Sequence, residues 1–141
     1  MEEIEAGGAA AIVCRVWAAH YGQQSKHVQW DWRDAAMLGG PGGGSEEALA
    51  EIKGLCGALG PAACAGICGV YAQSYDTWAG GLPDLLVWRR PEAEEGGGGE
   101  WVARFVEVKG PGDSLSHRQR AWIDNLLAWK VTVTVCHVVA V

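Results

Sequence analysis

The chain lacks an excess of positive charge. Its 141 residues include 11 Lys and Arg against 17 Asp and Glu, a formal net charge of -6. This balance argues against binding to polyanions through overall charge, so contact with nucleic acid requires a local basic surface. We expect one between Arg104 and Lys130, where five basic residues outnumber three acids. The basic residues are Arg104, Lys109, Arg118, Arg120 and Lys130, and the acids are Glu107, Asp113 and Asp124.

The cysteine pattern is not that of a disulfide-bonded or zinc-binding protein. The five cysteines are odd in number and include no Cys-x-x-Cys pair, so we expect small buried thiols in a reducing compartment rather than disulfides or a zinc site. The start, Met1-Glu2-Glu3, is acidic where a secretory or transit peptide is basic. We therefore expect no targeting segment and a cytosolic or nuclear protein.

No charged residue occurs from Gly54 to Tyr75, a length that could span a membrane. The stretch is built of Ala, Gly and Cys with Pro61 inside it, which favours a buried, closely packed helix and no membrane contact. A phosphate-binding loop is missing as well, because Gly44 precedes Ser45-Glu46 and not Lys-Ser or Lys-Thr.

The length predicts one domain, since 141 residues can enclose a core but leave no room for a second module of ordinary size. Residues 1–44 form a lead-in, with a helix expected from about Glu2 to Tyr21 and ended by Gly22. The segment Trp30–Trp32 is ambiguous, and Gly39–Gly44 predicts a flexible loop.

Two further helices should follow. Ser45 is a good first residue for a helix whose apolar face continues to Gly60, and Pro61 suits the first turn of another that runs towards Trp78.

The periodicity then changes from helical to strand-like. Strands are predicted at Asp84–Trp88, Trp101–Lys109 and Val131–Val139, with a dispensable excursion at Pro91–Glu100. Between the last two strands, Ser116-His117-Arg118-Gln119 fits a capping box that begins a helix. The expected order is helices, strand, strand, helix, strand, in an α/β fold.

Two acids and a lysine within these apolar strands are the main candidates for chemistry. Asp84 directly precedes one strand, and Glu107 and Lys109 share one face of the next because alternate strand residues point the same way. Asp84, Glu107 and the Val108 carbonyl offer the oxygen ligands that Mg²⁺ or Mn²⁺ prefers, and Lys109 can orient a water or stabilise a transition state. The alternative is a simple Pro-Asp turn and an unrelated surface ion pair.

The order acid, acid, lysine is that of PD-(D/E)xK nucleases, and its surroundings resemble the VRR-NUC domain of the Fanconi-associated nuclease 1 family. The resemblance is dense over residues 80–139, looser back to Ser45, and poor over 1–44, although we expect one domain over 1–141. Its segments are Gly80–Trp88, Phe105–Asp113, Leu115–Gln119 and Cys136–Val139.

The resemblance implies a restriction-endonuclease-like core, a small mixed sheet flanked by helices. It also implies a nuclear phosphodiesterase dependent on Mg²⁺ or Mn²⁺ that acts on branched DNA, including 5′ flaps, in interstrand cross-link repair. On that basis Asp84, Glu107 and Lys109 are the catalytic positions, and the Val108 carbonyl is a metal ligand.

The chain departs from the family in two places. The family has a further metal-binding Glu on an upstream helix, and none of Glu2, Glu3 and Glu5 can be aligned with it. The family tends to carry arginines before Gly-Gly-Leu-Pro-Asp, where this chain has Asp76–Ala79. Each lost cation weakens the phosphate contribution to DNA binding.

Four residues near the second and third strands have two interpretations each. Gln119 either contacts substrate or metal-bound water or only secures a helix start. His117 is expected to contact phosphate or to be a solvated turn residue rather than to bind metal, because no other histidine is suitably spaced. Arg118 and Arg120 either touch the DNA backbone or are solvated helix charges. The tryptophans could stack on unpaired bases, but Trp122 and Trp129 are at core spacing.

Two functions from different classes therefore stay open. The first is a divalent-metal-dependent, structure-selective nuclease, either a 5′-flap endonuclease or a 5′ to 3′ exonuclease, acting in DNA repair. The second is a catalytically impaired module that binds DNA junctions without cutting. The expected partners are branched or flapped DNA and, in addition, a second copy of the chain or the remainder of a longer nuclease. A self-associating structural domain is the weakest idea, because it leaves the acids and the lysine unexplained.

Overall fold

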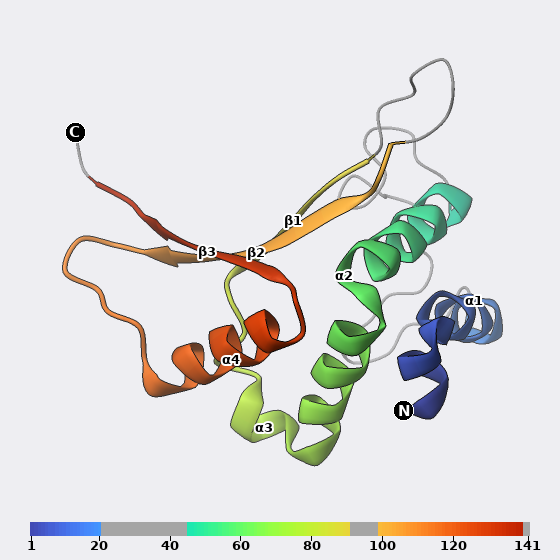
Figure 1. Cartoon of the computed structure of the whole chain (residues 1–141), viewed down its shortest axis with the longest axis horizontal. Helices are drawn as coiled ribbons and strands as arrows, with labels where there is room; N and C mark the ends of the chain where they lie inside the picture. Colours follow the sequence, from blue (N-terminus) through green and yellow to red (C-terminus); the bar gives the residue numbers. More distant parts are fainter. Residues whose placement is uncertain (21–44, 91–98, 140–141) are drawn as a thin grey trace.

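A computed structural model of the chain describes residues 1–20, 45–90 and 99–139. Helices come first and a three-stranded sheet follows, in the predicted order (Figure 1). The elements are η1 (Ile4–Gly8), α1 (Ala9–His20), α2 (Ser45–Gln73), α3 (Tyr75–Trp78), β1 (Leu85–Arg89), β2 (Val102–Lys109), α4 (His117–Ala128) and β3 (Thr132–His137).

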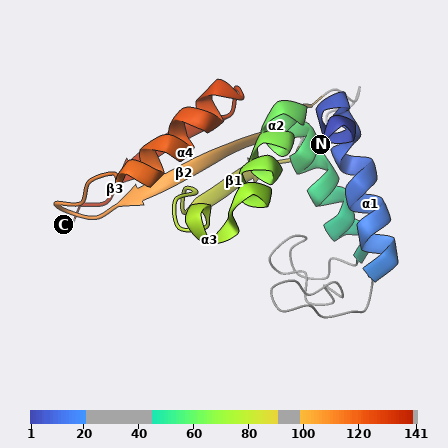
Figure 2. The same ribbon diagram turned by 90° about the horizontal axis from the view of Figure 1, so that it is seen from below.

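The sheet is mixed, with the strand order β1-β2-β3. β1 and β2 are antiparallel, with Leu85 opposite Val106, whereas β2 and β3 are parallel, with Lys109 beside His137. A parallel pair needs a crossover connection, which α4 supplies. Figure 2 shows α4 alongside β2. The predicted α/β fold, a small mixed sheet flanked by helices, is confirmed.

One face of this sheet carries the core. Phe105 in the centre of β2 packs with Ala63 of α2, Leu126 of α4 and Val131, all of them buried. Both long helices therefore cover the same face, since Phe105 meets residues of each. On the other face alternate residues such as Val87 are exposed. This asymmetry decides which strand residues can form an enclosed polar site.

The helix α2 is bent where the sequence predicts a break. Gly60 has φ 79 and ψ 163, a conformation that is essentially restricted to glycine, and Pro61 starts the next helical segment. The stretch Leu49–Gln73 is long and apolar enough to cross a membrane, and 17% of its most apolar window is buried. The expectation of a buried helix is thus wrong for most of its surface, because the core covers one side only. A single such helix is weak evidence for a span, and the absence of membrane contact stays a prediction.

The first twenty residues differ from the single helix expected from Glu2 to Tyr21. A short π-helix, η1, precedes α1, because Gly7 has φ 88 and interrupts the regular backbone. Both segments pack against α2. The predictions for Gly22, Trp30–Trp32 and Gly39–Gly44, and most of the excursion at 91–100, lie outside the described residues.

All five cysteines are free, as expected. The expectation that they are buried is wrong, because Cys68 and Cys136 are exposed and the other three are only half-buried. Cys136 lies on the uncovered face of the sheet, since its β2 neighbour Val108 alternates with the core-facing residues.

Candidate metal and nucleic-acid site

Asp84 lies immediately before β1 and reaches across to β2. Continuing the register of Leu85 with Val106 by one residue places Asp84 opposite Glu107. Asp84 Oδ2 accepts a hydrogen bond of 2.8 Å from the backbone N–H of Val108. The N–H and C=O of one strand residue point to the same side, so the Val108 carbonyl also faces the chain at Asp84. Asp84 is thus in contact with the backbone of β2 just before β1 begins, and Glu107 is the β2 residue opposite it.

Glu107 and Lys109 form an enclosed ion pair on the helix-covered face of β2. Their exposed fractions are 0% and 8%, and Lys109 Nζ lies 2.8 Å from Glu107 Oε1. Enclosure distinguishes this pair from the exposed ion pair considered as the alternative. Removing either partner would leave a buried charge without compensation.

Gln119 secures the start of α4, as one interpretation of the sequence expected, and it also contacts both charged residues of β2. In the capping box of α4, its backbone N–H donates to Ser116 Oγ at 3.2 Å, and its Oε1 accepts from the Ser116 N–H at 2.9 Å. The same side chain reaches the ion pair: Lys109 Nζ donates to its Oε1 at 3.1 Å, and its Nε2 donates to Glu107 Oε1. The start of α4 is therefore fastened to the two charged residues by one amide.

One carboxylate oxygen of Glu107 has no partner. Glu107 Oε2 is buried and accepts no hydrogen bond from any residue that the structure describes. A buried carboxylate oxygen normally has a partner, so this atom fits a cation bound beside it. Two carboxylates and a carbonyl are the hard oxygen donors that Mg²⁺ or Mn²⁺ takes, with water in the remaining positions. Within residues 1–20, 45–90 and 99–139, no cluster of three or more His, Cys, Asp or Glu side chains could hold a metal.

The turn before Asp84 is held by α4. Trp122 is fully buried, and its Nε1 donates to the Trp78 carbonyl oxygen at 2.9 Å. A Cβ on Gly81 would lie 2.5 Å from Arg118 Cγ and 2.7 Å from Trp122 Cδ1, so this position admits only glycine without movement. Core spacing predicted the packing of Trp122 correctly. Its hydrogen bond to the turn was missed, because a turn 44 residues away leaves no local signal.

The three predicted nucleic-acid residues lie on the first turn of α4, which borders the site through Gln119. His117, Arg118 and Arg120 are all exposed. The stem of Arg118 lies against the turn at Gly81, and Arg120 Nε donates to the Leu115 carbonyl oxygen at 3.2 Å.

The rest of the predicted basic surface is divided by the fold. Arg104 alternates with Phe105 and so projects from the uncovered face, opposite to Lys109. Lys130 follows the far end of α4. The basic surface expected from Arg104 to Lys130 is therefore restricted to Arg118 and Arg120 at the start of α4, since Lys109 is buried in its ion pair with Glu107.

None of the acids near the start of the chain approaches this site. Figures 1 and 2 both place η1 and α1 at the end of the molecule away from the C-terminal end of β2. Glu3 is exposed there and pairs with Arg15 at 2.7 Å. The further metal-binding Glu of the family therefore has no counterpart among the described acids of this region.

A second buried acid, Glu51 on α2, was not identified from the sequence. Its exposed fraction is 3%. Glu51 Oε2 accepts a hydrogen bond of 2.6 Å from Trp88 Nε1, and its carboxylate forms an ion pair with Arg90. Both partners lie at the end of β1 opposite to Asp84, so Glu51 joins α2 to the sheet outside the candidate site. Its sequence position, close behind Glu46 and Glu47 at a helix start, gave no signal of burial.

This fold and the arrangement of Asp84, Glu107 and Lys109 define a protein of the PD-(D/E)xK type. A family model described as the VRR-NUC domain matches residues 43–140, and the chain belongs to this family. The match begins close to the first residue of α2 and ends just beyond β3.

Several curated relatives are similar over nearly the whole chain. A Fanconi-associated nuclease 1 homolog of Oryza sativa subsp. japonica is 35% identical over 98% of this chain, and Fanconi-associated nuclease 1 of Ailuropoda melanoleuca is 36% identical over 93%. The chain spans only 12% and 11% of these two proteins.

A solved structure supports the same fold. The crystal structure of paFAN1 bound to DNA with a two-nucleotide 5′ flap and a gap has a TM-score of 0.61 and 22% sequence identity. The similarity covers 98% of this chain and 21% of that one. At this identity, the comparison concerns the fold.

Proposed function

We propose that the chain is the catalytic module of a divalent-metal-dependent nuclease that cuts branched or flapped DNA. The observation that carries this proposal is the state of Glu107. Its carboxylate is fully buried, with one oxygen held by Lys109 and Gln119 and the other without a hydrogen-bond partner among the described residues. Burying such a group has a large free-energy cost, which a bound cation would offset.

In this proposal each residue has a separate task. Asp84, Glu107 and the Val108 carbonyl hold Mg²⁺ or Mn²⁺. When bound, the ion acts as a Lewis acid towards the phosphate and makes a nearby water more acidic. Lys109 is fixed by Glu107 and Gln119 so that its ammonium can orient the attacking water or stabilise charge on the phosphate oxygens. Gln119 positions both charged residues rather than reacting itself.

The substrate class follows from the relatives. They are named Fanconi-associated nucleases, and paFAN1 was crystallised with flap DNA. We therefore propose 5′-flap endonuclease or 5′ to 3′ exonuclease activity, in interstrand cross-link repair in the nucleus. His117, Arg118 and Arg120 contact DNA phosphates at the start of α4. Because the chain spans so little of its relatives, the partner is the remainder of a longer nuclease or a second copy.

A junction-binding module without turnover is the second candidate. It is favoured by one specific observation: η1 and α1, which carry the acids nearest the start, lie away from the site. If the metal needs a further carboxylate, the described chain holds DNA without cutting it.

The decisive experiment follows cleavage of an end-labelled 5′-flap DNA by the full chain with Mn²⁺ or Mg²⁺. We expect cleavage that disappears with EDTA and falls by about 100-fold or more in Asp84→Asn, since the charge that holds the cation is lost while an acceptor for the Val108 N–H is kept. Lys109→Ala should be equally inactive. Asp124→Asn removes an exposed acid of α4 and serves as the matched control, with activity unchanged.

Binding of the same DNA, measured by fluorescence anisotropy, separates the two candidates. A wild-type chain as inert as Asp84→Asn but still able to bind the flap would refute the nuclease and establish the binding module. Cleavage that persists in EDTA, or in Asp84→Asn, would contradict the proposed metal site.

A further inference from the structure

The bend of α2 brings two cysteines together. Cys56 lies four residues before Gly60, and Cys64 lies four residues after it. In a straight helix eight residues span about 12 Å along the axis. Here the Cys64 thiol donates to the backbone carbonyl oxygen of Cys56, with 3.7 Å between sulfur and oxygen. The positive φ of Gly60 thus folds one half of the helix back far enough for the Cys64 thiol to reach the backbone of Cys56.

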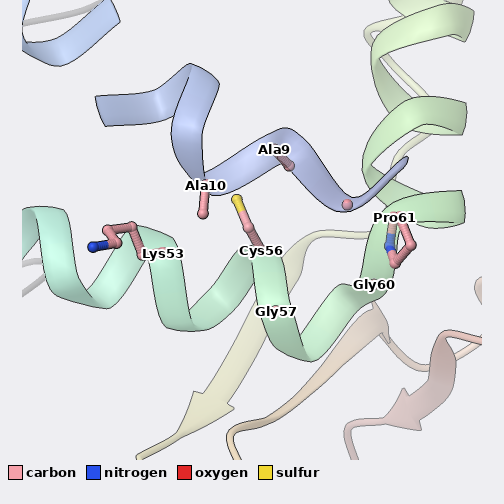
Figure 3. A pocket seen from close by; sticks show the side chains of 8 residues that line it. Ala9, Ala10, Lys53, Cys56, Gly57, Gly60 and Pro61 are labelled. Carbon is pink, nitrogen blue, oxygen red and sulfur yellow. The ribbon is translucent and has the colours of Figure 1, made fainter. Parts of the chain in front are cut away.

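Cys56 also faces a small cavity between α2 and the first helical segments of the chain. The cavity holds about 110 Å³ and is lined by Cys56 and Gly60 from α2 and by Gly7 and Ala10 from the opposite side. In Figure 3 the Cys56 sulfur points towards Ala10. A water molecule takes up about 30 Å³ of liquid, so hydrogen peroxide, which is little larger, fits beside this sulfur.

The environment favours the thiolate of Cys56. The Cys64 thiol is a hydrogen-bond donor to Cys56, and this lowers the pKa of Cys56 from 9.0 to about 7, against the opposing effect of burial. The same interaction raises the pKa of Cys64. Lys53 is the charged residue of the cavity lining, and its ammonium points away from the sulfur in Figure 3. Gly7, Ala9 and Ala10, which face Cys56, do not titrate.

We propose that Cys56 is a nucleophilic thiol sensitive to peroxide and that Cys64 is its resolving partner. The thiolate sulfur of Cys56 attacks one oxygen of hydrogen peroxide, the O–O bond breaks, and the departing hydroxide takes up a proton as water. Cys56 becomes a sulfenic acid by losing two electrons to the peroxide. The Cys64 sulfur then attacks the Cys56 sulfur. An S–S bond forms, and the hydroxyl leaves with the Cys64 proton as a second water.

This modification site is independent of the proposed nuclease. Among the cysteines, Cys68 is more exposed than Cys56 but does not line this cavity, so exposure alone would select the wrong residue. Thiolate character and a neighbouring thiol select Cys56.

The test treats the full chain with stoichiometric hydrogen peroxide and follows intact mass and a peptide map. We expect the loss of two hydrogens and a cross-linked peptide joining Cys56 to Cys64. Cys64→Ala should stop at a sulfenic acid on Cys56, which dimedone traps, and Cys56→Ala should leave Cys64 reduced. Cys68→Ala, on the same helix, is the matched control and should behave as wild type.

A second measurement follows the ionisation of Cys56 through the pH dependence of its alkylation. Alkylation of Cys56 by iodoacetamide should rise with pH around a midpoint of about 7, and in Cys64→Ala the midpoint should move up towards 9.0. A midpoint that Cys64→Ala leaves unchanged, or oxidation of Cys68 as fast as that of Cys56, would overturn the proposal.

Discussion

At the scale of single residues, the site depends on one amide with several partners. Gln119 caps a helix through Ser116 and also holds Glu107 and Lys109. Both charged side chains are buried, so their positions are fixed by neutral hydrogen bonds as well as by their mutual attraction. A residue identified as a cap can therefore be essential to the site's geometry.

Gly81 should be the residue least tolerant of a single methyl group. In Gly81→Ala, the added Cβ would collide with Arg118 Cγ, which can move, and with Trp122 Cδ1, which is held in the core. We expect a loss of about 1–3 kcal/mol in the free energy of unfolding, as for other overpacked sites. Urea denaturation followed by tryptophan fluorescence measures it.

Its neighbour provides the control. A Cβ on Gly80 would approach no atom closer than the 3.4 Å to Arg118 Nη1, the end of a flexible side chain. Gly80→Ala should change stability by less than about 0.5 kcal/mol, as surface substitutions usually do. Equal losses in the two variants would mean that the turn does not pack against α4 as described.

At the scale of elements, two helices fasten the two ends of β1. α4 holds the turn before Asp84 through the hydrogen bond from Trp122 to Trp78, and α2 holds the other end through Glu51 and Trp88. The candidate site lies at the α4 end. Each end of β1 is thus held by a different helix.

The contact of α2 with β1 should depend on a buried acceptor at residue 51. Glu51→Ala leaves the Trp88 indole N–H without its partner, and we expect a loss of about 1–3 kcal/mol in unfolding free energy. Glu51→Gln keeps an acceptor and should lose less. Chemical denaturation of the three proteins measures the difference.

Arg90→Ala separates the ion pair from the hydrogen bond. The Arg90 side chain is 54% exposed, so its removal should change stability by no more than about 1 kcal/mol. If Arg90→Ala were as harmful as Glu51→Ala, the charge pair and not the indole contact would hold α2 to the sheet.

At the scale of the whole molecule, the net charge of -6 means that the proposed DNA binding needs one small basic region. The start of α4 presents Arg118 and Arg120 to solvent, whereas Arg104 projects from the other face of the sheet. Binding should therefore involve few phosphates and lose little affinity with salt.

Salt dependence of DNA binding tests this arrangement. The slope of log affinity against log salt concentration should decrease by about 0.9 for each duplex phosphate contact removed, so Arg120→Gln should flatten it by about that amount. Arg104→Gln makes the same chemical change on the uncovered face and should leave the slope unaltered. Fluorescence anisotropy titrations at several salt concentrations give both slopes. A larger effect of Arg104→Gln would place the DNA on the uncovered face instead.

Much of the fold was predictable because its signals are local. The alternation of Val133 and Val135 with threonines specifies a strand, Ser116 and Gln119 specify a helix start, and Gly60-Pro61 specifies a break. The burial of Glu51 and the division of the basic surface were not predictable. Both depend on which face of the sheet the helices cover, and neither helix periodicity nor strand periodicity contains that information.

The sequence by itself determined the family, the order of the elements and the set of acids and lysine, because Gly-Gly-Leu-Pro-Asp and Glu-Val-Lys lie within short, regular segments. Only the tertiary structure decided that Asp84 stands opposite Glu107, that Gln119 joins the ion pair, and that Cys56 meets Cys64. Each of these contacts depends on strand register, helix packing or a bend in a helix, which bring distant residues together through the packing of the whole core.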